Sequence, residues 1–300
     1  MRWRIGYPCI NRTLGCSSSR TFRLASYSDD RLKETVEGNL NCLEQILEFN
    51  LKHDLLFFRI SSDLVPFASH PVCTFPWQHY FSEKLRRIGQ NIKKSNMRIS
   101  MHPDQFVLLN AKDARIVEQS ERELLYHAQV LDLMQLDTTA RIQIHLGGAY
   151  GDKAESMKRF VEKFSTLDPS IKRRLVIEND DKIYTVADCL SVNEQTRIPI
   201  LLDSFHHECN SSGETLEEAI SLCSQTWRKK DGRLMMDYSS QNPLNRKGSH
   251  VESINTRHFQ SFLKILRDTE ADIMLEIKDK EKSACKAIRI AQKLPGYSSQ

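Results

Sequence analysis

The chain has 300 residues, enough for one large domain or two ordinary ones and too many for a small scaffold that needs disulfides to fold. Apolar residues make up 40% and charged residues 27%, and no apolar run reaches the roughly 18 to 20 residues of a membrane span, so membrane spans are excluded. The 43 basic and 39 acidic residues give a net charge of +4, too small a surplus to identify a nucleic-acid-binding protein by itself.

The cysteines are scattered and form no C-x-x-C pair, which argues against a zinc ribbon and a thioredoxin-like redox pair. We therefore expect all eight to be free thiols: Cys9, Cys16, Cys42, Cys73, Cys189, Cys209, Cys223 and Cys285. The first residues lack the apolar core of a signal peptide, so the expected location is the reducing cytoplasm.

Short β-branched and aliphatic runs alternate along the chain with longer segments whose apolar residues recur at helical spacing. The helical pattern is clearest after the capping signal Ser28-Asp29-Asp30 and again from Val117 to Leu133. The predicted strands are Trp3 to Tyr7, Leu55 to Ile60, Arg98 to Met101, Arg141 to Leu146, Arg174 to Glu178, Ile198 to Asp203, Arg233 to Tyr238 and Asp272 to Glu276.

Eight βα units with no linker between them predict a single (β/α)₈ TIM barrel over residues 1–294, followed by a disordered tail at 295–300. Two connections, Ser61 to Phe81 and Ser239 to Asn255, are longer than the roughly 12 to 15 residues usual for structureless loops. Both follow a strand, which in such a barrel places them on the C-terminal face, where active sites form.

Charged, imidazole and phenol side chains stand at or just after the predicted strand ends, where we expect them to face one another. They are Tyr7, Arg59, His102, His145, Glu178, Asp203, His206, Asp237 and Glu276. Four of them are carboxylic acids, which repel one another when buried unless a cation neutralises them. Histidines with carboxylates and no thiolates favour manganese, zinc or iron, and bridging carboxylates favour more than one ion.

Each of these residues alone is more often structural than a ligand, so the prediction depends on their coincidence at the strand ends. The common phosphate-loop, nucleophile-elbow, zincin and dinucleotide motifs are absent from the sequence. The pair Gly147-Gly148 indicates a tight turn beside the histidine rather than a phosphate cradle.

Several blocks of the sequence closely resemble the UV damage endonuclease family, and together they cover nearly the whole chain. They are Gly6-Tyr7-Pro8-Cys9-Ile10-Asn11, Phe58-Arg59-Ile60-Ser61, Pro66-Phe67-Ala68-Ser69-His70-Pro71, Ser100-Met101-His102-Pro103-Asp104-Gln105-Phe106, His145-Leu146-Gly147-Gly148-Ala149-Tyr150-Gly151, Ile177-Glu178-Asn179-Asp180 and Asp203-Ser204-Phe205-His206-His207.

The resemblance implies a TIM barrel related to endonuclease IV and an ATP-independent nuclease that cuts immediately 5′ of cyclobutane pyrimidine dimers and 6-4 photoproducts, leaving a 3′-hydroxyl. Abasic sites are often accepted by this family. It also implies two or three divalent ions, with Mn²⁺ expected. The implied ligands are His102, His145 and Glu178 for one ion, Glu178, Asp203, Asp237 and Glu276 for a second, and His206 and His250 for a third.

Three positions depart from the family pattern. Some members have histidine where this chain has Asp237, and a lysine that can be carboxylated where it has Met235. Asp237 can still bind a hard cation, whereas Met235 cannot be carboxylated. The family often has tyrosine at the position of Phe106, which keeps the flat ring and loses the hydroxyl.

Recognition of a stacked lesion requires that it be turned out of the duplex, and Gln105 with Phe106 matches a wedge that fills the gap. Besides Glu178, the resemblance places Tyr7, Asn11 and His70 near the lesion or the scissile phosphate, with Tyr7 and His70 as catalytic candidates. Basic residues on the same rim are expected to grip the duplex: Arg59, Arg246, Lys247, Lys278, Lys280 and Lys282.

The expected partner is therefore double-stranded DNA carrying UV lesions, bound by a cytoplasmic monomer that associates with the nucleoid when it acts and needs neither a membrane nor a nucleotide cofactor. A metal-dependent sugar isomerase or epimerase is the alternative, because barrels with similar metal sites also perform that chemistry. A lesion-binding protein that no longer cuts is a third interpretation, suggested by Asp237 and Met235.

Overall fold

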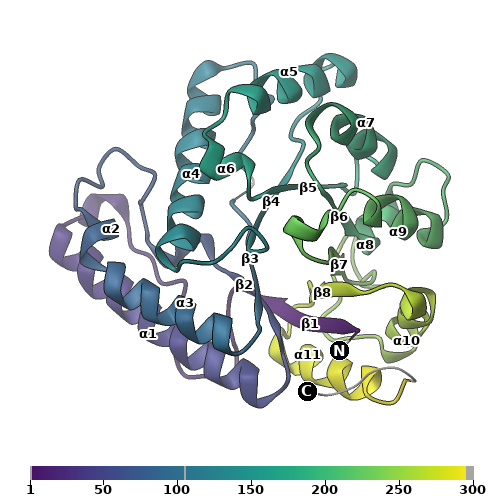
Figure 1. Cartoon of the computed structure of the whole chain (residues 1–300), viewed down its shortest axis with the longest axis horizontal. Coiled ribbons are helices and arrows are strands. Elements are labelled where there is room, and N and C mark those ends of the chain that lie inside the picture. The colour runs from purple at the N-terminus through teal and green to yellow at the C-terminus, as the bar shows by residue number, and fades with distance from the viewer. Residues whose placement is uncertain (1, 105, 295–300) are drawn as a thin grey trace.

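Eight parallel strands close into a barrel in the order β1 to β8, in a computed structural model that describes residues 2–104 and 106–294 (Figure 1). The strands are β1 (Trp3–Pro8), β2 (Phe57–Ile60), β3 (Arg98–Met101), β4 (Arg141–His145), β5 (Leu175–Glu178), β6 (Ile200–Asp203), β7 (Leu234–Tyr238) and β8 (Ala271–Leu275). The predicted TIM barrel is confirmed, with each predicted strand boundary within two residues of the observed one.

Helices lie around the barrel and connect its strands (Figure 1). The α-helices are α1 (Asp29–Lys52), α2 (Trp77–Tyr80), α3 (Ser82–Lys94), α4 (Ala114–Leu133), α5 (Lys153–Thr166), α6 (Pro169–Lys172), α7 (Val186–Thr196), α8 (Ser204–Cys209), α9 (Leu216–Ser224), α10 (Thr256–Ile265) and α11 (Glu281–Ala291). Short 3₁₀ turns are η1 (Leu24–Ser26), η2 (Ser62–Leu64), η3 (Lys229–Asp231) and η4 (Leu266–Asp268).

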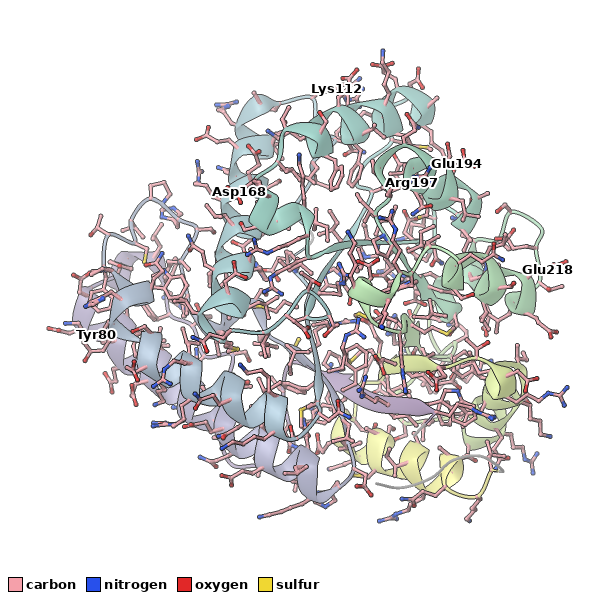
Figure 2. All side chains as sticks on the ribbon, in the orientation of Figure 1. Tyr80, Lys112, Asp168, Glu194, Arg197 and Glu218 are labelled. Atoms are coloured by element: carbon pink, nitrogen blue, oxygen red, sulfur yellow. A yellow bond between two sulfur atoms is a disulfide. The ribbon has the colours of Figure 1, made fainter. Side chains whose placement is uncertain are left out.

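Local sequence signals fix where several helices begin. The Ser28 side chain accepts a hydrogen bond from the Arg31 backbone N–H and caps α1, as predicted. Thr215 and Glu218 form a reciprocal capping box at the start of α9, and Glu218 is labelled at the outer edge of the molecule in Figure 2. Of the two long connections, the first contains η2 and α2, so it is more ordered than predicted.

An apolar layer fills the barrel just below its C-terminal end. Its residues are Phe57, Val176, Leu201, Met235 and Met274, all fully buried and in contact with one another. Successive side chains of a strand point to opposite faces, so the residue two positions further along each strand points the same way. Above this layer the same strands therefore present Arg59, Glu178, Asp203, Asp237 and Glu276. The sheet thus places a charged layer directly on an apolar floor.

The opposite, N-terminal end of the barrel is held by buried ion pairs. Arg98 Nη1 donates to Asp272 Oδ2 at 2.8 Å, and Arg4 lies 3.4 Å from the same carboxylate. Arg141 pairs in the same way with Asp231. These ion pairs connect strands that are distant in sequence. In a barrel of this kind the N-terminal end serves stability, whereas active sites form at the C-terminal end.

One prediction about the cysteines is wrong. Cys16 and Cys42 form a disulfide, because the segment after β1 packs against α1 and brings the two Cα atoms to 5.7 Å. Their separation of 26 residues in the chain gave no sign of this contact. The other six cysteines are free thiols, as predicted. The predicted tail at 295–300 lies outside the described residues, and within them no helix is long and apolar enough to cross a membrane.

Candidate active site

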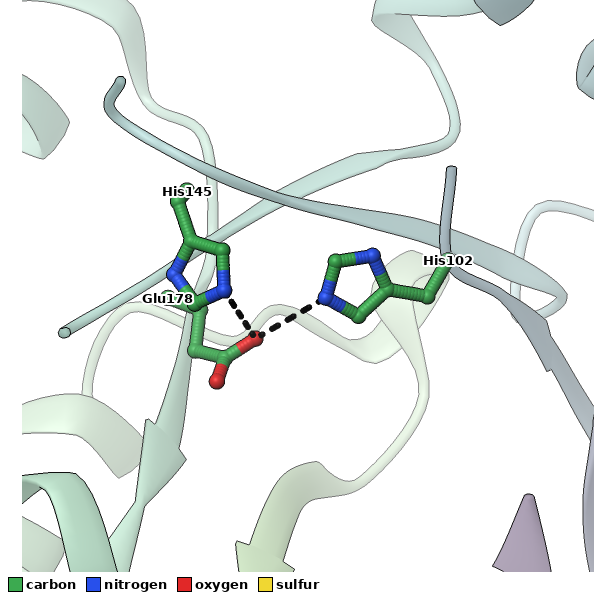
Figure 3. A group of neighbouring side chains, drawn as sticks. All are labelled: His102, His145 and Glu178. Carbon is green, nitrogen blue, oxygen red and sulfur yellow. Dashed lines mark ion pairs between the residues drawn. The ribbon is translucent and has the colours of Figure 1, made fainter. Parts of the chain in front are cut away.

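Two histidines and one glutamate converge where β3, β4 and β5 end. The Nε2 atoms of His102 and His145 lie 3.7 and 4.0 Å from the same oxygen of Glu178, and Figure 3 shows both rings turned toward it. Glu178 is 1% exposed. The three side chains offer ligand atoms that all lie within 4.8 Å of one another, close enough to share one metal ion.

Two of the candidate histidine ligands, His102 and His250, are oriented through their other ring nitrogen, whereas Nδ1 of His145 is buried without a hydrogen-bond partner. His102 Nδ1 lies 2.8 Å from the Pro103 carbonyl oxygen, and His250 Nδ1 lies 2.7 Å from that of Glu276. A carbonyl oxygen can only accept, so Nδ1 donates and Nε2 keeps its lone pair. Histidines that bind metals are commonly held by this kind of hydrogen bond.

A second group consists of Glu178, Asp203 and His206. Asp203 Oδ1 accepts hydrogen bonds from the backbone N–H groups of Phe205 and His206, both at 2.8 Å, and so caps α8. Its other oxygen is buried, accepts no hydrogen bond and lies 3.4 Å from His206 Nδ1, with which it forms an ion pair. His206 Nδ1 lies 3.3 Å from Glu178 Oε1, so Glu178 is shared between the first two groups.

The third group contains Asp203, Asp237 and Glu276. Arg59 donates to Asp237 Oδ2 at 2.6 Å and to Glu276 Oε1. Gln143 Nε2 donates to Asp237 Oδ2 and to Glu178 Oε2, both at 2.8 Å. The three groups of candidate ligands are therefore linked. Glu178 belongs to the first and second groups, Asp203 belongs to the second and third, and Gln143 connects Glu178 to Asp237.

Burial and charge shift the pKa values of this cluster in opposite directions. Burial, together with Glu178 and Glu276, raises the pKa of Asp203 to about 6. Burial opposes protonation of His206, but Asp203 and Glu178 outweigh it and raise its pKa to about 11. Burial and the nearby Arg59 lower the pKa of His102 to about 4, so this ring is neutral at pH 7. The residues present fit divalent cations, because the cluster offers a neutral imidazole, buried carboxylates and an unpartnered oxygen.

A cavity of about 780 Å³ opens above this cluster. Arg246, Lys278 and Lys280 line it together with Arg59, His102, His250 and Glu276. A second cavity of about 380 Å³ lies beside it and is lined by His102, His145, His206 and Asp180, among others. His102 lines both cavities, so the candidate ligands lie between a basic cavity and a neighbouring pocket.

The structure places several predicted residues away from the ligands. Tyr7 was expected to face the other strand ends, but its hydroxyl donates to Asn50 on α1 at 2.7 Å and accepts from Asn11 at 2.8 Å. Tyr7 therefore points toward the helices, because neighbouring residues of β1 alternate between the two faces of the sheet. Burial raises its pKa above the ordinary range. His70 is exposed in the loop after β2 and belongs to none of the three groups.

The predicted DNA-contacting residues are divided in a similar way. Arg59 is 3% exposed and lies within the cluster rather than on the rim. Phe106 is 50% exposed, as a wedge would need, whereas Gln105 lies outside the described residues. Lys247 donates to the Cys209 carbonyl oxygen instead of lining the larger cavity.

Sequence reasoning missed Gln143, which contacts two of the buried carboxylates. The alternation of side chains along β4 could have revealed it, because Gln143 is two residues before His145 and therefore points into the barrel. Met235, at the position where some family members have lysine, belongs to the apolar floor. Asp237, two residues further along β7, is the residue that contacts the cluster, where its carboxylate accepts a hydrogen bond from Arg59.

Comparison with known proteins agrees with this geometry. A family model described as UV-endonuclease UvdE matches residues 3–299. The chain belongs to the UV-endonuclease UvdE family. A UV DNA damage endonuclease of Clostridium perfringens is 37% identical over 95% of this chain and 70% of its own length. One from Bacillus cereus is 33% identical over 94% of this chain and 92% of its own length.

Solved structures place this UvdE-family chain among related barrels. The crystal structure of SacUVDE has a TM-score of 0.95 and 45% identity, covering 98% of this chain and 100% of that one. Endonuclease IV from Thermus thermophilus has a TM-score of 0.56 and 14% identity, covering 83% of this chain and 92% of its own, which shows a shared fold alone. A D-psicose 3-epimerase of Clostridium cellulolyticum is similar only at that level, with a TM-score of 0.54, 12% identity and coverage of 83% and 92%. The endonuclease interpretation is therefore favoured over the sugar epimerase alternative.

Proposed function

We propose that this enzyme nicks double-stranded DNA immediately 5′ of cyclobutane pyrimidine dimers and 6-4 photoproducts, and also acts at abasic sites. In this proposal it acts as a cytoplasmic monomer, associates with the nucleoid when it acts, needs no nucleotide cofactor and uses two or three divalent ions, with Mn²⁺ the preferred one. The observation that supports it most directly is the linked set of three ligand groups below a cavity lined by basic residues.

Hydrolysis of a phosphodiester requires an activated water and neutralisation of charge on the phosphoryl and departing oxygens. Bound divalent ions supply both at neutral pH. His102, His145 and Glu178 would hold one ion, Glu178, Asp203, Asp237 and Glu276 a second, and His206 and His250 a third. In this arrangement the histidines are ligands rather than general bases, and the neutral His102 ring has the Nε2 lone pair that a ligand needs.

The lesion must leave the base stack before its 5′ phosphate can reach the ligands. A crosslinked pyrimidine pair stacks poorly, so turning it out costs less than for an undamaged pair. The half-exposed ring of Phe106, with its neighbour Gln105, is proposed to fill the gap. Asn11, in the loop that follows β1, donates a hydrogen bond to the Tyr7 hydroxyl. We propose that these two residues and His70 lie near the lesion or the scissile phosphate.

Basic side chains on the cavity rim are proposed to bind the DNA backbone. Arg246 and Lys280 line the cavity, and within the described part of the chain neither forms an ion pair with a carboxylate. Lys278 also lines it, although it pairs with Glu252 at 2.5 Å and must exchange that partner for a phosphate. Contacts of this kind make binding dependent on salt and independent of sequence.

Nicking of UV-irradiated supercoiled plasmid tests the proposal, with unirradiated plasmid, EDTA and Mn²⁺ as parallel conditions. We expect nicking only when the plasmid is irradiated and Mn²⁺ is present. A duplex with one thymine dimer, labelled at its 5′ end, then shows whether the cut lies immediately 5′ of the lesion. An intact irradiated plasmid, with a protein that carries Mn²⁺, would contradict the proposed nuclease activity.

A further inference from the structure

Arg59 at the end of β2 lies inside the cluster of ligands. Its guanidinium donates to Asp237 Oδ2 at 2.6 Å and to Glu276 Oε1, and the residue is 3% exposed. Its Nε atom is buried and has no hydrogen-bond partner. Among the described residues, this side chain therefore donates its hydrogen bonds to two candidate metal ligands.

The carboxylates of the third group are each held by one oxygen. Arg59 and Gln143 occupy Asp237 Oδ2, Arg59 occupies Glu276 Oε1, and the first backbone N–H groups of α8 occupy Asp203 Oδ1. Asp237 Oδ1 is buried and has no hydrogen-bond partner, whereas Asp203 Oδ2 has an ion-pair contact with His206 Nδ1 at 3.4 Å. A buried acceptor without a partner is costly, so Asp237 Oδ1 is suited to binding a cation.

We propose that Arg59 is a positioning residue, which holds Asp237 and Glu276 so that their other oxygens form an all-oxygen cation site with Asp203. This inference rests on the proposed metal dependence and deepens it. The site is distinct from the one at His102 and His145, where imidazole nitrogens contribute.

The planar guanidinium is suited to this role because its two terminal nitrogens can each bond a different carboxylate at a fixed angle. A lysine keeps the positive charge but offers a single ammonium group on a flexible chain, so it cannot fix both carboxylates in the same way. Arg59→Lys therefore separates orientation from charge, whereas Arg59→Met removes both.

The two sites should differ in the ions that they accept. Oxygen-only sites favour hard cations such as Mn²⁺ and Mg²⁺, whereas sites with imidazole also favour Zn²⁺. We therefore expect Zn²⁺ to compete with Mn²⁺ at the histidine site and to leave the carboxylate site to Mn²⁺.

Mn²⁺ titration followed by electron paramagnetic resonance of the free ion measures the affinity of each site. We expect two classes of site in the wild-type protein, and one class weakened by about 10- to 100-fold in Arg59→Lys, with the other unchanged. Added Zn²⁺ should displace the class that survives. Arg98→Lys is the matched control, because Arg98 is also buried and bonded to an acid, at the other end of the barrel. It should leave both classes intact.

Circular dichroism shows whether each variant is folded. If Arg59→Met does not fold, the Mn²⁺ affinities of Arg59→Lys alone decide the inference. The inference is overturned if Arg59→Lys keeps both affinities, if it gains a site, or if the wild-type protein has a single class. These binding results do not depend on nicking. If the wild-type protein has two classes of Mn²⁺ site but shows no damage-dependent nicking, the proposed function is contradicted. The effect of Arg59→Lys on Mn²⁺ affinity still decides whether Arg59 is a positioning residue.

Discussion

Lys280 adopts a backbone conformation that is unfavourable for a residue with a side chain. It precedes α11 with φ 54° and ψ −118°, where glycine is the residue usually tolerated. Burial, partly offset by Glu276, lowers the pKa of its ammonium group, and the residue lines the larger cavity. Strain of this kind persists where surrounding structure enforces it, often at functional sites.

We expect Lys280→Gly to stabilise the fold by about 1 kcal/mol, because glycine relieves the strain at some cost in unfolded-state entropy. The same change should weaken DNA binding and reduce its dependence on salt, because a cation is lost. Urea unfolding and binding titrations at two salt concentrations measure these effects. Lys280→Ala is the control, since it removes the charge and retains the strain. Equal stabilities for the two variants would show that strain is unimportant here.

His127 on α4 carries a pH dependence of stability. It is fully buried, its Nδ1 donates to the Glu123 carbonyl oxygen at 2.7 Å, and burial lowers its pKa from 6.5 to about 4. The unfolded chain therefore binds a proton between these two pH values when the folded protein does not. Stability from neutral His127 is complete above pH 6.5 and is lost as the pH falls toward 4.

Relative to His127→Gln, the wild-type protein should lose about 3 kcal/mol of stability between pH 7 and pH 4. Urea unfolding of both proteins across this range measures the difference. The exposed residue His53 gives the control His53→Gln, which tests whether loss of any imidazole has the same effect. If the two variants showed the same pH dependence, burial of His127 would not be its cause.

At the scale of elements, a disulfide fastens the segment after β1 to α1. Cys16 lies in that segment and Cys42 on α1, with 26 residues between them in the chain. The same segment begins with Cys9, which lines the larger cavity. Constraining a loop of this length in the unfolded chain stabilises the fold by about 3 kcal/mol.

Cys16→Ser should therefore lower the free energy of unfolding by about 3 kcal/mol in the absence of reductant. Dithiothreitol should lower the wild-type protein to the same level and leave the variant unchanged. Cys73→Ser, which removes a free thiol, is the control. Urea unfolding with and without reductant measures all three, and an unchanged wild-type midpoint in dithiothreitol would contradict the expected contribution.

The elements were predictable because period and capping are local properties, whereas parts of the site depend on direction and packing. Ser28 and the spacing of apolar residues were sufficient to predict α1. The direction of Tyr7 required the register of β1 in the closed sheet, and the pairing of Arg59 with Asp237 required contact across 178 residues. The disulfide likewise depended on packing of a loop against a helix.

At the scale of the whole molecule, an apolar layer separates two polar ends of the barrel. The layer contains Phe57, Val176, Leu201, Met235 and Met274. The candidate ligands lie on its C-terminal side, and the ion pair between Arg98 and Asp272 lies on its N-terminal side. The ends should therefore respond independently to substitution, because changes at distant sites without shared partners are additive. Unpaired oxygens at the upper end cost stability, whereas the paired charges at the lower end hold strands together.

Asp272→Asn should lower the free energy of unfolding by about 3 to 5 kcal/mol, because it leaves the buried Arg98 without a counter-ion. Its Mn²⁺ content, measured per folded protein, should remain that of the wild type. Glu178→Gln should lose Mn²⁺, and the metal-free variant should also be less stable than the wild type, because the charged His206 loses one of its carboxylate partners. Urea unfolding in EDTA and elemental analysis after dialysis against Mn²⁺ measure the two properties. Loss of metal in Asp272→Asn, with the fold intact, would show that the two ends are coupled through the apolar layer.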